Sequence, residues 1–527
     1  MQTSRVSKTV QNAIRYRFSL DVQSAYWFKL FSTIVLIALG GVLCLPYLDL
    51  PLHTDSAVYA HAAYWWMHGD TLYRNFTITR PQGIFVVFGL IEAIGLGSIR
   101  GIHFAAGITI VLCALLLLKI AAMVWGRAVG FGAAVLFVLM MGTPDLEGFT
   151  ANAELFMLLP VLGSLYLLLQ SDQFSLDSRR GRLLLIGCGL LAAIGLLVKP
   201  AGVVSLPLAA LWLLRRQWHD KLGWWQWFRG EAILGISFLL GLLPALLHGL
   251  LTVPDIYLYV ILLYRLGNDS LAANPLLYQL SIFGQRSLGL VIRLPIVLIV
   301  PVGFHVSHSM SAGNARGRDL LWLWTITSLG GTAMGGNWYP HYYQQLLPPL
   351  TVAVSLGLHT LLRSSVRYSR LRFFGQGMAV AGLLALAIGT AIVLASPADP
   401  IKLILPSTPA TFAPREVIDP VVAYLIEHTA ETDTIYVAYQ QTDIYYLAHR
   451  QSAGRWPDFP DLAHIPGAFD EQVALLADPV TAPRYIVAAQ PFDALGFDPQ
   501  GKLRAVVARD YTLETTIGDI PLYRRNR

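Results

Sequence analysis

The chain has 527 residues, of which 55% are hydrophobic and only 13% are charged, and its mean hydropathy is +0.54. An average soluble protein carries about 25% charged residues, so this composition excludes a water-soluble globule and a disordered chain. Three cysteines are too few for a disulfide-built secreted scaffold. The formal charge is +12 over residues 1–395 and −6 over residues 396–527. No nucleic-acid-binding motif accompanies the basic residues, so nucleic acid is not expected as a partner.

The apolar part predicts a polytopic α-helical membrane protein with about eleven transmembrane helices within residues 28–395. A bilayer core roughly 30 Å thick needs about 20 apolar residues per helix. The basic segment 1–27 precedes the first span and indicates an uncleaved signal anchor. The predicted spans are 28–48, 102–125, 128–144, 152–170, 183–199, 200–215, 231–253, 286–304, 319–336, 342–362 and 376–395.

One further apolar stretch, 82–98, contains Glu92 and four glycines and is either a twelfth span or a membrane-embedded half-helix. If it does not cross, one side of the membrane collects 20 Lys and Arg residues and the opposite short loops collect six. Loops rich in Lys and Arg stay cytoplasmic. We therefore expect eleven spans in the plasma (inner) membrane, a cytoplasmic N-terminus, and an external loop at 49–101.

Residues 396–527 differ in character, because their apolar runs are short and alternate between helical and strand patterns. A helix is predicted at 416–429, strands at 433–439 and 484–490, and two more strands within 503–525. These elements predict a small α/β domain on the external face.

The first external loop carries Asp55 just beyond the first span. A carboxylate at this boundary suits a general base that takes a proton from an acceptor hydroxyl. Judged by its spacing alone, Asp55 would more commonly cap a helix beginning at Ser56. Three cations, Arg74, Arg80 and Lys199, are placed to bind a phosphate leaving group. The alternative is that they extend toward lipid headgroups.

Two other segments carry candidate polar groups. The second loop contains Asp145, Glu147 and Glu154, which could hold a metal, orient an acceptor or belong to a solvated loop with Asn152 capping the next helix. The segment 337–349 places His341 and Tyr342 at a helix start, where aromatic residues often form an interfacial belt. Tyr59 and its aromatic neighbours could stack on a sugar. Arg293, inside a predicted span, should face a cavity or a partner.

Taken in order, these segments resemble the bacterial branch of the dolichyl-phosphate-mannose-protein mannosyltransferase family, which includes the lipid A aminoarabinose transferase and belongs to the C superfold of membrane glycosyltransferases. The matching segments are Asp55-Ser56-Ala57-Val58-Tyr59, Gly69 to Asn75, Arg80-Pro81, Ala151-Asn152-Ala153-Glu154, Lys199-Pro200, and His341 to Pro349.

The resemblance implies transfer of a sugar from a polyprenyl-phosphate donor to an acceptor hydroxyl on a glycolipid, polysaccharide or protein. It implies Asp55 as the catalytic base, Lys199, Arg74 and Arg80 at the donor phosphate, and His341 and Tyr342 near the donor. The family often has an acidic residue after the catalytic Asp, where this chain has Ser56. We therefore expect a metal-independent reaction that inverts the anomeric configuration, with no cofactor.

Two alternatives have the same gross composition. A transporter or lipid flippase is favoured by Arg293 but disfavoured by the long first loop and the absence of repeats. A polysaccharide ligase or polymerase should have a larger, basic late external loop than the short 337–343 turn.

Overall fold

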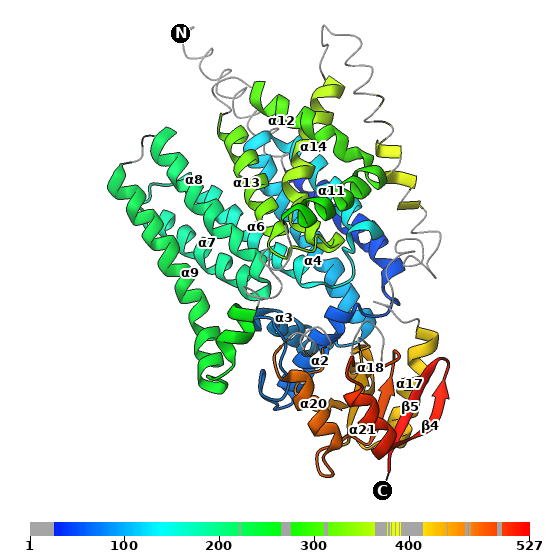
Figure 1. Ribbon diagram of the computed structural model, residues 1–527. Helices are drawn as coiled ribbons and strands as arrows, with labels where there is room; N and C mark the ends of the chain where they lie inside the picture. Colours follow the sequence, from blue (N-terminus) through cyan, green and yellow to red (C-terminus); the bar gives the residue numbers. More distant parts are fainter. Residues whose placement is uncertain are drawn as a thin grey trace, which may run out of the picture.

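The computed structural model describes residues 26–219, 221, 223–264, 276–309, 315–363, parts of 377–391, 415–439, 441–458, 462, 465–492 and 498–526. Most of the predicted N-terminal segment 1–27 and of the predicted span 376–395 lies outside the described residues, as does the start of the predicted C-terminal domain. The described chain forms a helical bundle with a small α/β domain at one end (Figure 1).

The chain is a multi-pass membrane protein. Among the described residues, five helices are long and apolar enough to cross a membrane, or six if one bent pair is counted as a span. The five are Tyr26–Tyr47, α4 (Ile99–Trp125), α6 (Ala153–Ser171), α7 (Arg179–Val198) and α9 (Trp224–Thr252). The count of eleven spans stays a prediction. The other bundle helices are α5 (Arg127–Met141), α8 (Ser205–His219), α12 (Val300–Ser309), α13 (Ala315–Ala333) and α14 (Leu347–Arg363).

Helix burial follows position in the bundle. The apolar window of α6 is 72% buried, whereas that of α9 is 28% buried and exposes leucines such as Leu239 and Leu240. An apolar outer face is stable only against lipid. Helices α7 and α9 approach closely at Gly189, where an added Cβ would lie 2.6 Å from the Leu234 carbonyl oxygen.

The predicted span 286–304 is wrong as a single helix. Helix α11 (Leu276–Arg293) ends at Arg293, and the chain turns by 99° before Pro295–His308. Pro295 disfavours helical conformation at Leu294 and lacks the amide needed to continue the ladder. A short 3₁₀ helix, η5 (Pro295–Ile299), and the short α-helix α12 follow the bend.

The first loop contains two helices, α2 (Thr54–Met67) and α3 (Gln82–Ala93), with no span between them. Helix α3 has 12 residues and is about 18 Å long at 1.5 Å per residue, too short to cross a bilayer core. This length agrees with a half-helix at 82–98 and not with a twelfth span.

The C-terminal domain contains a five-stranded sheet of order β2-β1-β3-β5-β4. Strand β1 (Thr434–Ala438) pairs in parallel with β2 (Gln451–Ser452) and β3 (Tyr485–Ala488), and β5 (Ile520–Arg525) is antiparallel to β3 and β4 (Tyr511–Ile517). The helices are α17 (Arg415–His428), α18 (Asp443–Ala448), α20 (Ala468–Ala477) and α21 (Lys502–Asp510). The first part of 503–525, predicted as strand, is helix α21, whose buried Leu503, Val506 and Val507 follow helical spacing.

This domain packs on the first loop through specific polar contacts. The Tyr446 hydroxyl donates to Glu92 at 3.2 Å and to the Gly97 carbonyl, and the Thr442 hydroxyl donates to the Thr54 carbonyl at 3.3 Å. These contacts explain the acidic Glu92 in an otherwise apolar helix. They also place the first loop and the C-terminal domain at the same end of the bundle (Figure 1).

Candidate functional site

Asp55 lies in the first turn of α2 but does not cap the helix. The cap is His53, whose Nδ1 accepts a hydrogen bond from the Asp55 amide at 3.3 Å. Burial lowers the pKa of His53, and accepting this hydrogen bond requires the lone pair of an unprotonated Nδ1. The carboxylate of Asp55 is therefore left for other partners.

Those partners are Arg80 and Tyr59. The Arg80 Nη2 lies 3.7 Å from the Asp55 carboxylate, the Tyr59 hydroxyl donates to the same oxygen at 3.4 Å, and Arg80 Nε donates to Tyr59 at 3.0 Å. The Asp55 side chain is 31% exposed, so a substrate can reach it. Burial raises the pKa of Asp55. The charges of Arg80, His53, Lys199 and His341 together outweigh this effect and lower the pKa to about 2.

The second loop and the 337–349 segment meet beside α2. His341 Nδ1 lies 2.6 Å from the Glu147 carboxylate, and its Nε2 lies 3.5 Å from Glu154. Glu154 also forms an ion pair with Lys199, whose ammonium group lies 4.6 Å from the centre of the Tyr342 ring. Three segments far apart in sequence thus share one buried network.

His53 connects the group around Asp55 with the group around His341, because the ring centroids of His53 and His341 lie 5.9 Å apart. We refer to the whole group as the Asp55 cluster, which comprises His53, Asp55, Tyr59, Arg80, Glu147, Glu154, Lys199, His341 and Tyr342. His53 was not predicted as a site residue; its position two residues before Asp55, at a helix start, was the available signal in the sequence.

The backbone is held firmly around the cluster. Glu147 adopts a left-handed conformation with φ of 51°, which costs free energy for a residue with a side chain. The amide of Gln344 donates to the Leu146 carbonyl at 2.7 Å and to the Glu147 carbonyl at 3.2 Å. Ser56 ties α2 to the same loop by donating to the Thr150 carbonyl at 2.7 Å. This bracing aims the Glu147 side chain at His341.

The fold identifies the structural relatives. Lipid-phosphate-bound ArnT from Cupriavidus metallidurans, solved with undecaprenyl phosphate, is 14% identical and has a TM-score of 0.60, with 93% of this chain and 97% of that one covered. AglB from Archaeoglobus fulgidus, an oligosaccharyltransferase solved with an inhibitory peptide and a dolichol-phosphate, is 12% identical and has a TM-score of 0.56, with 96% of this chain and 75% of that one covered. The arabinofuranosyltransferase AftD from Mycobacteria is 14% identical and has a TM-score of 0.51, with 93% of this chain and 41% of that one covered.

The chain shares the fold of these three proteins, the C superfold. No protein-family model and no curated protein sequence matches it. At these identities the likeness establishes the fold alone, so the role of each residue has to be argued from the geometry of this chain.

Two predicted site residues lie outside the Asp55 cluster of this C-superfold chain. Arg74 donates to the Thr252 carbonyl at 2.7 Å. Asp145 forms an ion pair with Arg293 at 3.0 Å. Arg293 ends α11 at the bend, and its side chain is half exposed. Its ion pair with Asp145 agrees with the expectation that Arg293 faces a partner.

Unused hydrogen-bonding capacity remains beside the cluster. Asn152 precedes α6 without forming the expected side-chain cap, and neither atom of its buried amide has a partner among the described residues. Glu154 Oε2 is likewise buried without a partner. Buried polar groups are normally paired, so these atoms are available to a bound ligand.

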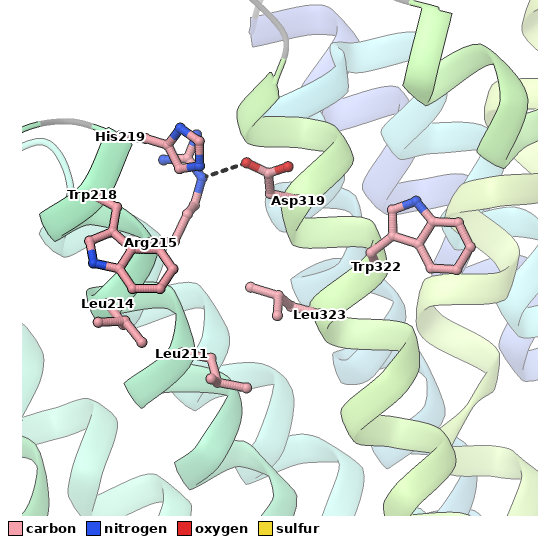
Figure 2. A pocket seen from close by; sticks show the side chains of 8 residues that line it. All are labelled: Leu211, Leu214, Arg215, Trp218, His219, Asp319, Trp322 and Leu323. Atoms are coloured by element: carbon pink, nitrogen blue, oxygen red, sulfur yellow. Dashed lines mark hydrogen bonds and ion pairs between the residues drawn. The ribbon is translucent and has the colours of Figure 1, made fainter.

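A cavity of about 310 Å³ lies elsewhere in the bundle, between α8 and α13 (Figure 2). Its walls include Leu211, Trp218 and Trp322, and Arg215 forms an ion pair there with Asp319 at 3.0 Å. The paired charges fasten α8 to α13, and no member of the Asp55 cluster lines this cavity. Among the described residues, no group of three or more His, Cys, Asp and Glu side chains is arranged to hold a metal ion.

Proposed function

We propose that the protein transfers a sugar from a polyprenyl-phosphate donor to an acceptor hydroxyl on the external face of the plasma membrane. The observation that carries the proposal is the Asp55 cluster, which joins a partly exposed carboxylate to two cations, Arg80 and Lys199, within a C-superfold chain. A base and a phosphate-binding group are the two functions that this reaction requires.

In the proposed reaction Asp55 accepts the proton of the acceptor hydroxyl as that oxygen attacks the anomeric carbon. The bond from the anomeric carbon to the phosphate oxygen breaks, and the phosphate leaves with the electron pair. Attack from the face opposite the leaving group inverts the configuration. With a pKa near 2, Asp55 is a weak base, so it acts mainly by orienting the hydroxyl and receiving its proton late.

The Asp55 cluster supplies two cations that could bind the phosphate. Arg80 contacts Asp55, whereas Lys199 is paired with Glu154 and lies over the Tyr342 ring. We assign the phosphate to Arg80 and Lys199 and not to Arg74, which lies outside the cluster. The prenyl tail would lie against the apolar helices, and the reaction is proposed to need no metal or other cofactor.

The experiment is transfer of radiolabelled sugar from a panel of polyprenyl-phosphate sugars to lipid, polysaccharide and protein fractions. We expect Asp55→Asn to reduce transfer by at least about 10²-fold, the usual minimum contribution of a general base. Asp49→Asn is the matched control, because Asp49 lies in the same loop but pairs with Arg100 at the surface. Equal transfer by Asp55→Asn and wild type would exclude Asp55 as the base.

Arg293, the residue that favoured the transporter alternative, is paired with Asp145 of the second loop. Neither a transporter nor a polysaccharide ligase is supported by a specific feature of the described residues.

A further inference from the structure

A second cavity, whose walls are largely polar, lies where the first loop meets the C-terminal domain. It has a volume of about 320 Å³ and is lined from the loop side by His61, Trp65, Asp70 and Arg74, and from the domain side by Arg455 and Glu471 among others. No residue that lines this interdomain cleft belongs to the Asp55 cluster, although His61 follows Tyr59 by two residues on α2.

The cleft contains buried polar atoms without partners. His61 is 1% exposed, and neither of its ring nitrogens has a hydrogen-bond partner among the described residues. The indole N–H of Trp65 is also buried without one. Burial lowers the pKa of His61 to about 3, so its neutral ring offers one donor and one acceptor. Unpaired buried groups destabilise a fold, and a ligand that supplied their partners would remove that cost.

The walls of the cleft favour a neutral ligand. Two carboxylates, Asp70 and Glu471, balance the two guanidinium groups of Arg74 and Arg455. Arg455 forms two hydrogen bonds to Glu471 at 2.9 Å, and Gln451 donates to Asp70 at 2.7 Å. The lining therefore has no excess positive charge with which to attract a phosphate. It combines fixed donors and acceptors with the aromatic face of Trp65.

We propose that the interdomain cleft binds a neutral carbohydrate segment of the acceptor, with His61 and Trp65 hydrogen-bonded to its hydroxyl groups. Sugar hydroxyls both donate and accept, as the two free nitrogens of His61 require. The volume lies at the lower end of the range for small-molecule sites. The proposal rests on the proposed function only in calling the carbohydrate an acceptor. It also gives the C-terminal domain a role, because that domain supplies one wall.

The test measures binding directly. Full-length protein in detergent is titrated with a panel of neutral oligosaccharides of two to four hexose units, and separately with inorganic phosphate, by isothermal titration calorimetry. We expect wild type to bind a neutral oligosaccharide more tightly than phosphate. His61→Phe and Trp65→Phe keep the aromatic bulk and remove the N–H groups, and each should weaken binding about tenfold, the effect of losing one or two hydrogen bonds. Asp49→Asn should bind as wild type does.

Thermal unfolding separates binding from folding. His61→Phe should unfold at a temperature no lower than wild type, because it removes unpaired buried nitrogens. Trp65→Phe provides an independent reading if His61→Phe does not fold. Unchanged binding in the folded variants, absence of oligosaccharide binding by wild type, or preference for phosphate would each overturn the proposal. Carbohydrate binding without sugar transfer from any donor would refute the proposed function and leave the cleft proposal intact.

Discussion

At the scale of single residues, Asp55 shows how neighbours set the behaviour of a carboxylate. Burial alone would raise its pKa, and the nearby cations, with Arg80 the largest contributor, lower it to about 2. A group with a lowered pKa stays ionised at all pH values above that pKa. The proposed base is therefore already charged throughout the physiological range.

This predicts a specific change in the pH profile of transfer. In wild type, Asp55 stays ionised at every pH above about 3, so its protonation should not lower the rate of transfer in that range. Arg80→Gln removes the main opposing charge, so the pKa of Asp55 should rise and an acidic limb should move to higher pH. The measurement is kcat/KM against pH, with Arg80→Lys as the charge-preserving control.

The shift of the limb distinguishes this role from simple loss of phosphate binding, which would lower the rate equally at every pH. A profile of unchanged shape in Arg80→Gln would show that Arg80 does not control the ionisation of Asp55.

At the scale of elements, the start of α2 determines where Asp55 points. His53 occupies the cap position and accepts from the Asp55 amide. We expect His53→Ala to lower the free energy of unfolding by about 0.5–2 kcal/mol, the range for loss of an N-cap. Fraying should be confined to the first turn, so hydrogen exchange should rise at the amides of Thr54 to Ala57.

The comparison variant is His53→Asn, because asparagine is a good N-cap residue. It should restore most of the protection and stability that His53→Ala loses. If the alanine and asparagine variants exchange at the same rate, the cap does not hold this turn, and the position of Asp55 depends on Arg80 and Tyr59 instead.

At the scale of the whole molecule, local patterns in the sequence predicted most of the elements that the structure describes. Helical spacing located α17, and apolar strand runs located β1 and β3. Two predictions were wrong, one of a single long helix and one of a strand. Residues 286–304 are apolar enough for a span, but Pro295 bends the chain, and 503–510 contains β-branched residues that nevertheless repeat at helical spacing.

The candidate site was predictable in its members more than in its contacts. Asp55, Glu154, Lys199 and His341 lie in segments whose order and sidedness resemble a known family. Glu147 was proposed from the acidic composition of the second loop alone. Their pairing joins residues nearly two hundred positions apart, as between Glu147 and His341, and no local pattern encodes such a pairing. The same reason hid the Asp145–Arg293 ion pair and the buried nitrogens of His61.

Docking of the C-terminal domain on α2 provides the last prediction. Asp443 begins α18, next to Thr442, whose hydroxyl donates to Thr54 beside Asp55. Burial raises the pKa of Asp443 to about 7, against weaker lowering by its backbone hydrogen bonds and with a further rise from Asp419. Between its unfolded value near 4 and pH 7, the folded protein binds the proton more tightly, so stability falls as pH rises through that window and is constant above it.

We therefore expect the free energy of unfolding to fall between pH 4 and 7 by an amount on the order of a few kcal/mol from this group. Asp443→Asn should remove that slope and should be more stable than wild type above pH 7, because its side-chain oxygen still accepts from the Ile444 amide. The measurement is thermal unfolding across this pH range. Asp419→Asn, at a more exposed position, is the control and should keep most of the slope. An unchanged slope in Asp443→Asn would mean that other groups control the stability of the docked domain.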